Sequence, residues 1–295
     1  MIGVTLKYGQ LGNNLMAYAN IIAVAEEHGL TAIYPAFYDY APEFVGTADN
    51  PLCRYPALHI CKLPPAARRF LFRACASVTD RIGSKPFPMV TRVSVAPGTV
   101  MDANAPAFIA AARRRIVLTD GWAIHNAEMV VKHSDKIRAY FQPVEKYRSV
   151  IADTVANARR DCDLLIGVHI RKSDFKTYAG GKYYWSDDQY AERLRDLSAV
   201  FPDRRLHFLI CSDEPISPLL LDAFTAFPGP GSMIGDLYSL AGCDYIIGTP
   251  STFARWAAFY GKVPAYLMSD VKRPIIRDDF INFESPNYHS NESVA

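Results

Sequence analysis

Short apolar runs alternate with helical patterns throughout the second half of the chain, and this alternation restricts the possible folds more than any other feature. The runs are too short for helices and rich in branched residues, which is typical of buried strands. Strands are predicted at residues 164–169, 206–211, 244–247 and 264–268, and helices at 187–200, 215–224, 236–242 and 253–260. Strands and helices that alternate in this way form a parallel, doubly wound α/β sheet.

The first half opens with a similar unit and then becomes irregular. Its predicted elements are a strand at 2–7, a glycine-containing turn at 8–14, a helix at 15–28, a strand at 31–34, a helix at 65–78 and a strand at 116–119. A helix at 144–160 leads into the second half, and the polar tail at 277–295 is expected on the surface. We therefore predict two Rossmann-like domains, residues 1–143 and 144–295, whose parallel sheets face a central cleft.

Composition excludes several classes of protein. A net charge of +2 with 50% hydrophobic residues does not indicate a disordered protein or one with an extensive basic surface for nucleic acid. No signal peptide is visible at the start and no run of 18 apolar residues occurs, so a cytoplasmic protein is expected. The six cysteines form no C-x-x-C pair and are expected to be reduced and mostly buried. The glycine patterns of NAD-binding and P-loop sites are missing.

Three polar clusters each follow a predicted strand. They are 169–174, 211–215 and 248–253. Because the carboxyl ends of parallel strands line the ligand crevice of an open α/β sheet, we expect the three clusters to form one site. In contrast, Asp161 and Asp163 form a D-x-D that precedes its strand, so a turn at a helix end is expected there instead of a metal site.

The first and third clusters contain groups that suit a phosphate. Arg171 can grip phosphate with two N–H groups, although a strand-end arginine can also form an ordinary surface salt bridge. Ser251 and Thr252 begin a predicted helix whose N-terminus attracts anions, or they are simple caps. His169 shares the strand face of Arg171 and is a ligand contact or a core histidine. Asp174 is expected to hold Arg171 in place.

Other residues leave two interpretations open. Asp213 can accept two hydrogen bonds from guanine, whereas Ser212 or Asp213 can instead cap a helix ahead of Pro215. The aromatic residues at 183–185 precede a capping box at 186–189 and either staple that helix or stack on a sugar. Arg68, Arg69 and Arg73 alternate with aromatic residues on a predicted helix. They form a solvated face or contact an anionic membrane surface.

Four ordered stretches resemble the GDP-fucose-dependent fucosyltransferases, in particular the α-1,2-fucosyltransferase family. They are residues 9–19, residues 118–122 with the helix around 137–141, residues 169–174, and residues 251–258. The resemblance implies a GT-B fold, a GDP-sugar donor, a glycan acceptor, inversion at the anomeric carbon, and no metal or other cofactor. The chain departs from the family pattern at Asn14, Ala17, Lys172, Pro250 and Arg255, and Ala179 stands at the spacing of a glutamate base in the α-1,6 branch.

The resemblance also implies roles for individual residues. Arg171 would bind the β-phosphate beside His169, and Asp213 would read guanine. The pyrophosphate would be held by Ser251, Thr252 and Phe253 from the second domain and by Gly12 and Asn13 from the first. Together with Asp174, the residues Arg171 and His169 form the predicted catalytic set.

The sequence therefore predicts a metal-independent, inverting fucosyltransferase, with peripheral contact at the inner face of a membrane left open. A transferase for another GDP-linked deoxysugar and a non-catalytic nucleotide- or glycan-binding relic are the alternatives. Pairing with Arg171 would lower the pKa of Asp174 and make it a poor base. We therefore expect a carboxylate of the first domain, Asp39 or Glu43, to deprotonate the acceptor.

Overall fold

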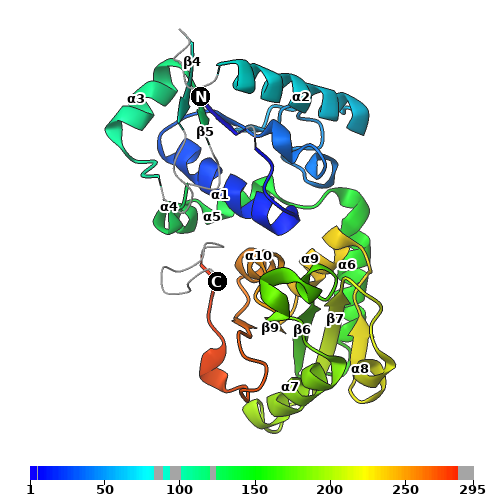
Figure 1. The fold of residues 1–295 in the computed structure, drawn as a ribbon. Coiled ribbons are helices and arrows are strands. Elements are labelled where there is room, and N and C mark those ends of the chain that lie inside the picture. The colour runs from blue at the N-terminus through cyan, green and yellow to red at the C-terminus, as the bar shows by residue number, and fades with distance from the viewer. Residues whose placement is uncertain (5, 83–88, 94–100, 120–123, 285–295) are drawn as a thin grey trace. The chain divides into compact units, whose positions relative to one another are not determined.

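The computed structural model describes residues 1–4, 6–82, 89–93, 101–119 and 124–284. The chain forms two compact units, unit 1 from Met1 to Val144 and unit 2 from Glu145 to Ala295. Each unit is built around its own sheet (Figure 1). Gly121 and Trp122 of the family-like segment, and the predicted tail beyond residue 284, lie outside the described residues.

Unit 1 has strands in the order β3-β2-β1-β5-β4, parallel except for the antiparallel pair β2 and β3. The strands are β1 (Ile2–Val4), β2 (Ala32–Ile33), β3 (Arg54–Tyr55), β4 (Val90–Val93) and β5 (Ile116–Thr119). The helices are α1 (Leu11–Glu27), α2 (Pro65–Ile82), α3 (Pro106–Arg114), α4 (Ala127–Lys132) and α5 (Ser134–Tyr140), with 3-10 turns η1 (Pro35–Phe37) and η2 (Ala41–Glu43). Periodicity predicted β5 correctly but missed α3, α4 and α5, which are short.

Helix α1 begins at Leu11, four residues before the predicted start at 15. Gly12 and Asn13 therefore lie in its first turn and not in a loop. The prediction was wrong because Leu11 is buried and the side chain of Asn14 bonds the backbone just ahead of the helix, which supports an earlier start. Almost every residue of α1 up to Ala25 is buried, as expected for a helix that is apolar all round.

Unit 2 has strands in the order β10-β9-β6-β7-β8, and every neighbouring pair is parallel. The strands are β6 (Leu164–Ile170), β7 (Leu206–Ser212), β8 (Ala226–Pro228), β9 (Tyr245–Gly248) and β10 (Ala265–Leu267). The helices are α6 (Glu145–Ala158), α7 (Asp187–Val200), α8 (Pro218–Asp222), α9 (Met233–Leu240) and α10 (Thr252–Gly261), with 3-10 turns η4 (Asp174–Lys176), η5 (Tyr178–Gly181) and η6 (Arg277–Asp279). The predicted α/β class with mainly parallel sheets is confirmed.

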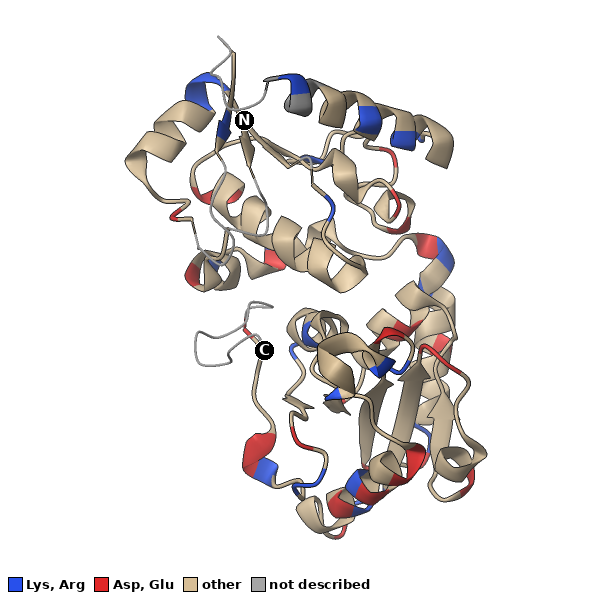
Figure 2. Ribbon diagram, in the orientation of Figure 1, with Lys and Arg blue, Asp and Glu red and all other residues tan. Residues whose placement is uncertain are grey.

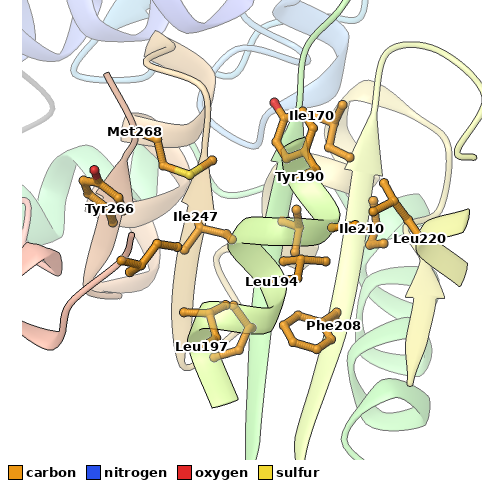
Figure 3. Close-up of a cluster of buried hydrophobic side chains, with 14 of the residues drawn as sticks. Ile170, Tyr190, Leu194, Leu197, Phe208, Ile210, Leu220, Ile247, Tyr266 and Met268 are labelled. Atoms are coloured by element: carbon orange, nitrogen blue, oxygen red, sulfur yellow. The ribbon is translucent and has the colours of Figure 1, made fainter. Parts of the chain in front are cut away.

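The core of unit 2 fixes the strands that carry the polar clusters. Leu194 and Leu197 of α7 pack on Phe208 and Ile210 of β7, and all four side chains are buried (Figure 3). Burial of each such side chain stabilises the fold by about 1.5 to 3 kcal/mol. Alternate residues of β6 point to opposite faces, so Ile170 faces this core while His169 faces the other side of the sheet.

The solvated face predicted for Arg68, Arg69 and Arg73 is wrong for Arg68. Arg68 is buried and its guanidinium donates to the backbone carbonyls of Thr47, Ala48 and Asn50. A guanidinium with five donors can replace the water it loses by binding several carbonyl oxygens. Within the described part of the chain, no helix is both long and apolar enough to cross a membrane.

Candidate functional site

The three polar clusters of unit 2 lie at one edge of the sheet. Strand β6 is flanked by β9 and β7, and His169 pairs with Gly248 on one side and Cys211 on the other. The approach of β9 to β6 needs glycine at 248, because a Cβ there would lie 2.4 Å from the carbonyl oxygen of His169. The loops that follow these three strands therefore start side by side.

His169 connects β6 to the start of α10. Its ring stacks on Phe253 with centroids 5.0 Å apart, and its Nδ1 lies 3.3 Å from the Oγ of Ser251. Burial, assisted by the nearby charge of Arg171, lowers the pKa of His169 to about 4. His169 is therefore a neutral imidazole near pH 7, able to donate or accept a hydrogen bond but not to supply positive charge.

Arg171 supplies the positive charge at this edge. Its Nε and Nη2 donate to the two carboxylate oxygens of Asp174 at 2.8 and 2.7 Å, and its guanidinium lies 5.2 Å from the ring centroid of Phe175. The hydrogen bond from Arg171 lowers the pKa of Asp174. A guanidinium has five N–H donors, so the two that Asp174 accepts leave three for an anionic ligand.

The start of α10 offers an anion site beside His169. Ser251 is the N-cap and accepts a hydrogen bond from the N–H of Ala254 at 3.1 Å. The N–H groups of Thr252 and Phe253 lie in the first helical turn, where the helix itself provides no acceptor. Capping and anion binding are therefore compatible here, because the cap uses one N–H group and leaves others for a ligand.

Asp213 braces the loop after β6. Its Oδ1 accepts from the N–H of Lys172 at 2.8 Å, and its Oδ2 accepts from the N–H and hydroxyl of Ser173 at 3.3 and 2.6 Å. The alternative that Ser212 or Asp213 caps a helix is wrong, because Ser217 caps α8 and Pro218 occupies the first helical position. Sequence reasoning placed the two loops at one site but missed this contact, because the partners of Asp213 are mainly backbone N–H groups, which every residue type offers.

Asp236 is a second carboxylate at this edge, and no motif drew attention to it. It lies in the first turn of α9, is buried, and accepts from the N–H of Gly231 at 2.9 Å. Burial raises the pKa of Asp236 to about 6. A buried carboxylate with a raised pKa at the ligand-binding edge of a sheet is a candidate functional group. The Gly-Pro-Gly-Ser segment at 229–232, a turn followed by the N-cap of α9, could have drawn attention to the start of this helix.

The aromatic residues after β6 divide into two groups. Trp185 is buried against Tyr190 of α7, and Ser186 begins that helix with the predicted capping box, so the staple interpretation holds for Trp185. Tyr183 instead groups with Phe175 and Tyr178, whose ring centroids are 5.2 Å apart. Tyr178 is 46% exposed. An aromatic surface therefore extends from Arg171 to solvent.

In unit 1, the loop that precedes Gly12 and Asn13 is shaped by Asn14. The amide nitrogen of Asn14 donates to the carbonyls of Tyr8 and Gln10 at 2.7 and 2.8 Å, and its oxygen accepts from the hydroxyl of Tyr34 at 2.9 Å. Of the two carboxylates expected to serve as a base, Asp39 forms an ion pair with Lys7.

The D-x-D of Asp161 and Asp163 lies ahead of β6, as predicted, in the turn that follows α6. Asp163 accepts from the N–H of Arg205 at 2.8 Å, which explains its presence structurally. Considering only the described residues, no three His, Cys, Asp or Glu side chains are grouped so that they could hold a metal ion.

No protein-family model matches the chain, and no curated protein matches it either. Solved structures are similar in fold. A point mutant of Arabidopsis thaliana FUT1 in complex with GDP has a TM-score of 0.56 at 12% identity, covering 90% of this chain and 69% of that chain. NodZ α-1,6-fucosyltransferase soaked with GDP-fucose has a TM-score of 0.54 at 18% identity, and the match covers 92% of this chain and 96% of that chain.

Selenomethionine NodZ from Bradyrhizobium gives a TM-score of 0.53 at 18% identity, covering 92% of this chain and 96% of that chain. The fold matches these fucosyltransferase structures. At such identities the likeness establishes the architecture, an α/β GT-B fold with mainly parallel sheets, and leaves the chemistry to the residues themselves. Those residues place a guanidinium, a neutral imidazole and a helix N-terminus at one edge, an arrangement suited to binding a phosphorylated ligand.

Proposed function

We propose that the protein transfers L-fucose from GDP-fucose to a hydroxyl group of a glycan, with inversion and without a metal. The observation that carries the proposal is that Arg171 and the N-terminus of α10 follow the neighbouring strands β6 and β9 at the same edge of the unit 2 sheet. The fold match supports it, because FUT1 and NodZ were solved with GDP or GDP-fucose. The α-1,2 linkage rests on the sequence resemblance, whereas NodZ is an α-1,6-fucosyltransferase.

The proposed chemistry is electrostatic. As the bond between the anomeric carbon and the β-phosphate oxygen breaks, negative charge grows on the departing GDP. The N–H groups of Arg171 and of Thr252 and Phe253 would stabilise this charge, with Gly12 and Asn13 as further pyrophosphate contacts. Donors already in place need no reorganisation during the reaction, which makes such stabilisation effective.

For guanine we propose Asp236 in place of Asp213. By a count of lone pairs, three hydrogen bonds leave Asp213 one free site on Oδ1 and none on Oδ2. Burial raises the pKa of Asp236, which means that the hydrogen bonds it accepts do not fully compensate its carboxylate for the loss of water. The N1–H and N2–H₂ groups of guanine would supply two donors and stabilise the carboxylate.

The acceptor and its base complete the proposal. The new bond forms between the acceptor oxygen and the anomeric carbon, and the hydroxyl proton passes to a base. Asp174 is poorly suited to this role, because its pairing with Arg171 lowers its pKa. Asp39 or Glu43 of unit 1 remains the proposed base. The aromatic surface of Phe175, Tyr178 and Tyr183 is the proposed contact for the acceptor sugar.

A donor screen followed by turnover tests the function. GDP-fucose, GDP-mannose, UDP-sugars and free GDP are compared by thermal shift, because a ligand that binds only the folded state raises the melting temperature. The donor that binds is then incubated with a glycan panel, and product linkage is read by NMR. Binding and turnover of another GDP-deoxysugar would favour a transferase for that sugar. Binding of GDP without any turnover would favour a non-catalytic relic.

The metal-free mechanism has its own test. A rate that collapses in EDTA and recovers with Mg²⁺ or Mn²⁺ would refute it.

A further inference from the structure

One face of α2 is held firmly against unit 1. Arg68 is 1% exposed and donates to carbonyls of the 47–50 turn, including those of Thr47 at 3.2 Å and Asn50 at 3.3 Å. One turn further along, Phe72 stacks on Tyr38 with centroids 5.1 Å apart. These contacts define the inner side of the helix and orient the rest of it.

The outer side of α2 is exposed and carries a large aromatic side chain. At 3.6 residues per turn, Phe70, Arg73 and Ser77 lie roughly opposite Arg68, and all three are exposed. Phe70 is 71% exposed, the highest value among the large apolar side chains of the described residues. Burial of such a side chain is strongly favourable, so Phe70 would gain stability if a partner covered this side of the helix.

The segment just before α2 carries further exposed apolar side chains. Leu58 is 48% exposed and Ile60 is 66% exposed. The N–H groups of Ile60 and Cys61 donate to the carbonyl of Asp49 at 2.9 and 3.0 Å. Asp49 lies in the turn that Arg68 binds, so the exposed segment and the start of α2 share one anchor.

The charge of this region is entirely basic. No Asp or Glu occurs between Asp49 and Asp80, whereas Lys62, Arg69 and Arg73 are exposed there. None of these three forms a salt bridge with a described residue. Figure 2 shows the basic positions along α2. Uncompensated basic side chains beside exposed apolar ones are typical of helices that lie in the interface of an anionic bilayer.

We propose that this α2 surface, formed by Leu58, Ile60, Lys62, Arg69, Phe70 and Arg73, binds an anionic phospholipid membrane. Phe70 and Ile60 would enter the headgroup region, while the three basic side chains would contact lipid phosphates. Neither part is sufficient alone: an anionic bilayer attracts each basic residue only weakly, and one or two apolar anchors bind reversibly. This inference is independent of the reaction that the protein catalyses.

Vesicle sedimentation of the full chain tests the proposal. We expect binding to vesicles of phosphatidylcholine with phosphatidylglycerol, no binding to phosphatidylcholine alone, and release as salt screens the charges. Arg69→Gln with Arg73→Gln should lower the partition coefficient more than about tenfold, since each basic residue contributes about fivefold. Phe70→Trp should shift its fluorescence to the blue on anionic vesicles.

The matched control is Arg113→Gln with Arg114→Gln, an equal change of charge at two exposed positions of α3 in the same unit. It should change the partition coefficient less than about twofold. All the substituted side chains are exposed, and circular dichroism verifies that the variants remain folded. If both double variants lost vesicle binding equally, the net charge of the protein and not the α2 surface would explain the binding, and the proposal would be overturned. Absence of vesicle binding, with or without binding to heparin or an acidic protein, would also overturn it.

Discussion

In unit 1 the turn that leads into α1 is held by an uncharged amide, although Lys7 ahead of it pairs with Asp39, whereas in unit 2 the loop after β6 is held by charged groups. The amide of Asn14 binds the backbone of Tyr8 and Gln10, supported by the hydroxyl of Tyr34. In unit 2, Asp213 binds the backbone of Lys172 and Ser173, and Asp174 binds Arg171. Both loops follow a strand that has a parallel neighbour on each side, so the same position in the architecture is stabilised by different chemistry.

A neutral side chain and a charged one serve a loop in different ways: the first fixes its shape, and the second can also bind an anion. A neutral amide in a buried site holds its loop with little dependence on salt or pH. An ion pair at the surface is weaker in water, but its guanidinium remains available to another anion such as a phosphate. The charged loop of unit 2 is therefore the one suited to bind an anion, and the amide of Asn14 in unit 1 is suited to fix the shape of its own loop.

The largest expected effect is on turnover. Arg171→Ala should lower kcat/KM by about 100-fold or more, because it removes the donors proposed for the leaving pyrophosphate. The control is Arg159→Ala, which removes another bidentate arginine, paired with Asp244 ahead of β9. That variant should keep its rate within about threefold once folded. Comparable losses in both variants would mean that Arg171 acts through structure.

A second prediction concerns pH in unit 2. The folded pKa of His169 is about 4 and its ordinary value is 6.5, so between these values the unfolded chain binds the extra proton. The free energy of unfolding therefore includes the full contribution of neutral His169 above pH 6.5 and loses it as the pH falls toward 4. Relative to His169→Gln, wild type should lose on the order of 3 kcal/mol across this window. Hydrogen exchange of β6 peptides in the full chain measures it, and parallel pH curves would contradict the prediction.

The neutral brace of unit 1 should matter for stability. Asn14→Ala removes hydrogen bonds to Tyr8 and Gln10 in a buried site, so local stability of α1 should fall by about 2 to 3 kcal/mol. Tyr34→Phe removes one hydrogen bond to Asn14 and should cost about 1 kcal/mol. Hydrogen exchange of α1 peptides reports both. Unchanged protection in Asn14→Ala would show that the loop is held by other contacts.

The last prediction concerns the nucleotide selectivity of the two carboxylates of unit 2. Asp236→Ala should weaken GDP by about 1.5 to 3 kcal/mol more than UDP or ADP, because only guanine offers the paired donors. Asp213→Ala should weaken all three nucleotides alike by loosening the loop of Arg171. Calorimetric titration of each nucleotide decides between them. A guanine-specific loss in Asp213→Ala alone would restore the role first predicted for that residue.

Sequence reasoning predicted unit 2 far better than unit 1. Strands β6, β7 and β9 are short apolar runs, and α7 begins with a capping box, so local patterns alone indicate these elements. In unit 1 the helices α3 and α5 begin without a side-chain cap, whereas the equally short helices α8 and α9 of unit 2 begin at the capping residues Ser217 and Ser232. Periodicity did not place α3, α4 or α5, and only the family resemblance indicated a helix near α5.

The sequence by itself determined the parallel architecture of unit 2 and the presence of Arg171, His169 and Ser251 at strand ends, because period and chain order decide where strands end. The pairing of Arg171 with Asp174 was also predicted, but only the tertiary structure decided the other side-chain contacts. It buried Arg68, turned Asp213 toward the loop of Lys172, and placed Asp236 beside the same edge. These contacts join residues that are far apart in sequence or on different elements, and hydrogen bonding in a buried site depends on positions in space that local periodicity does not contain.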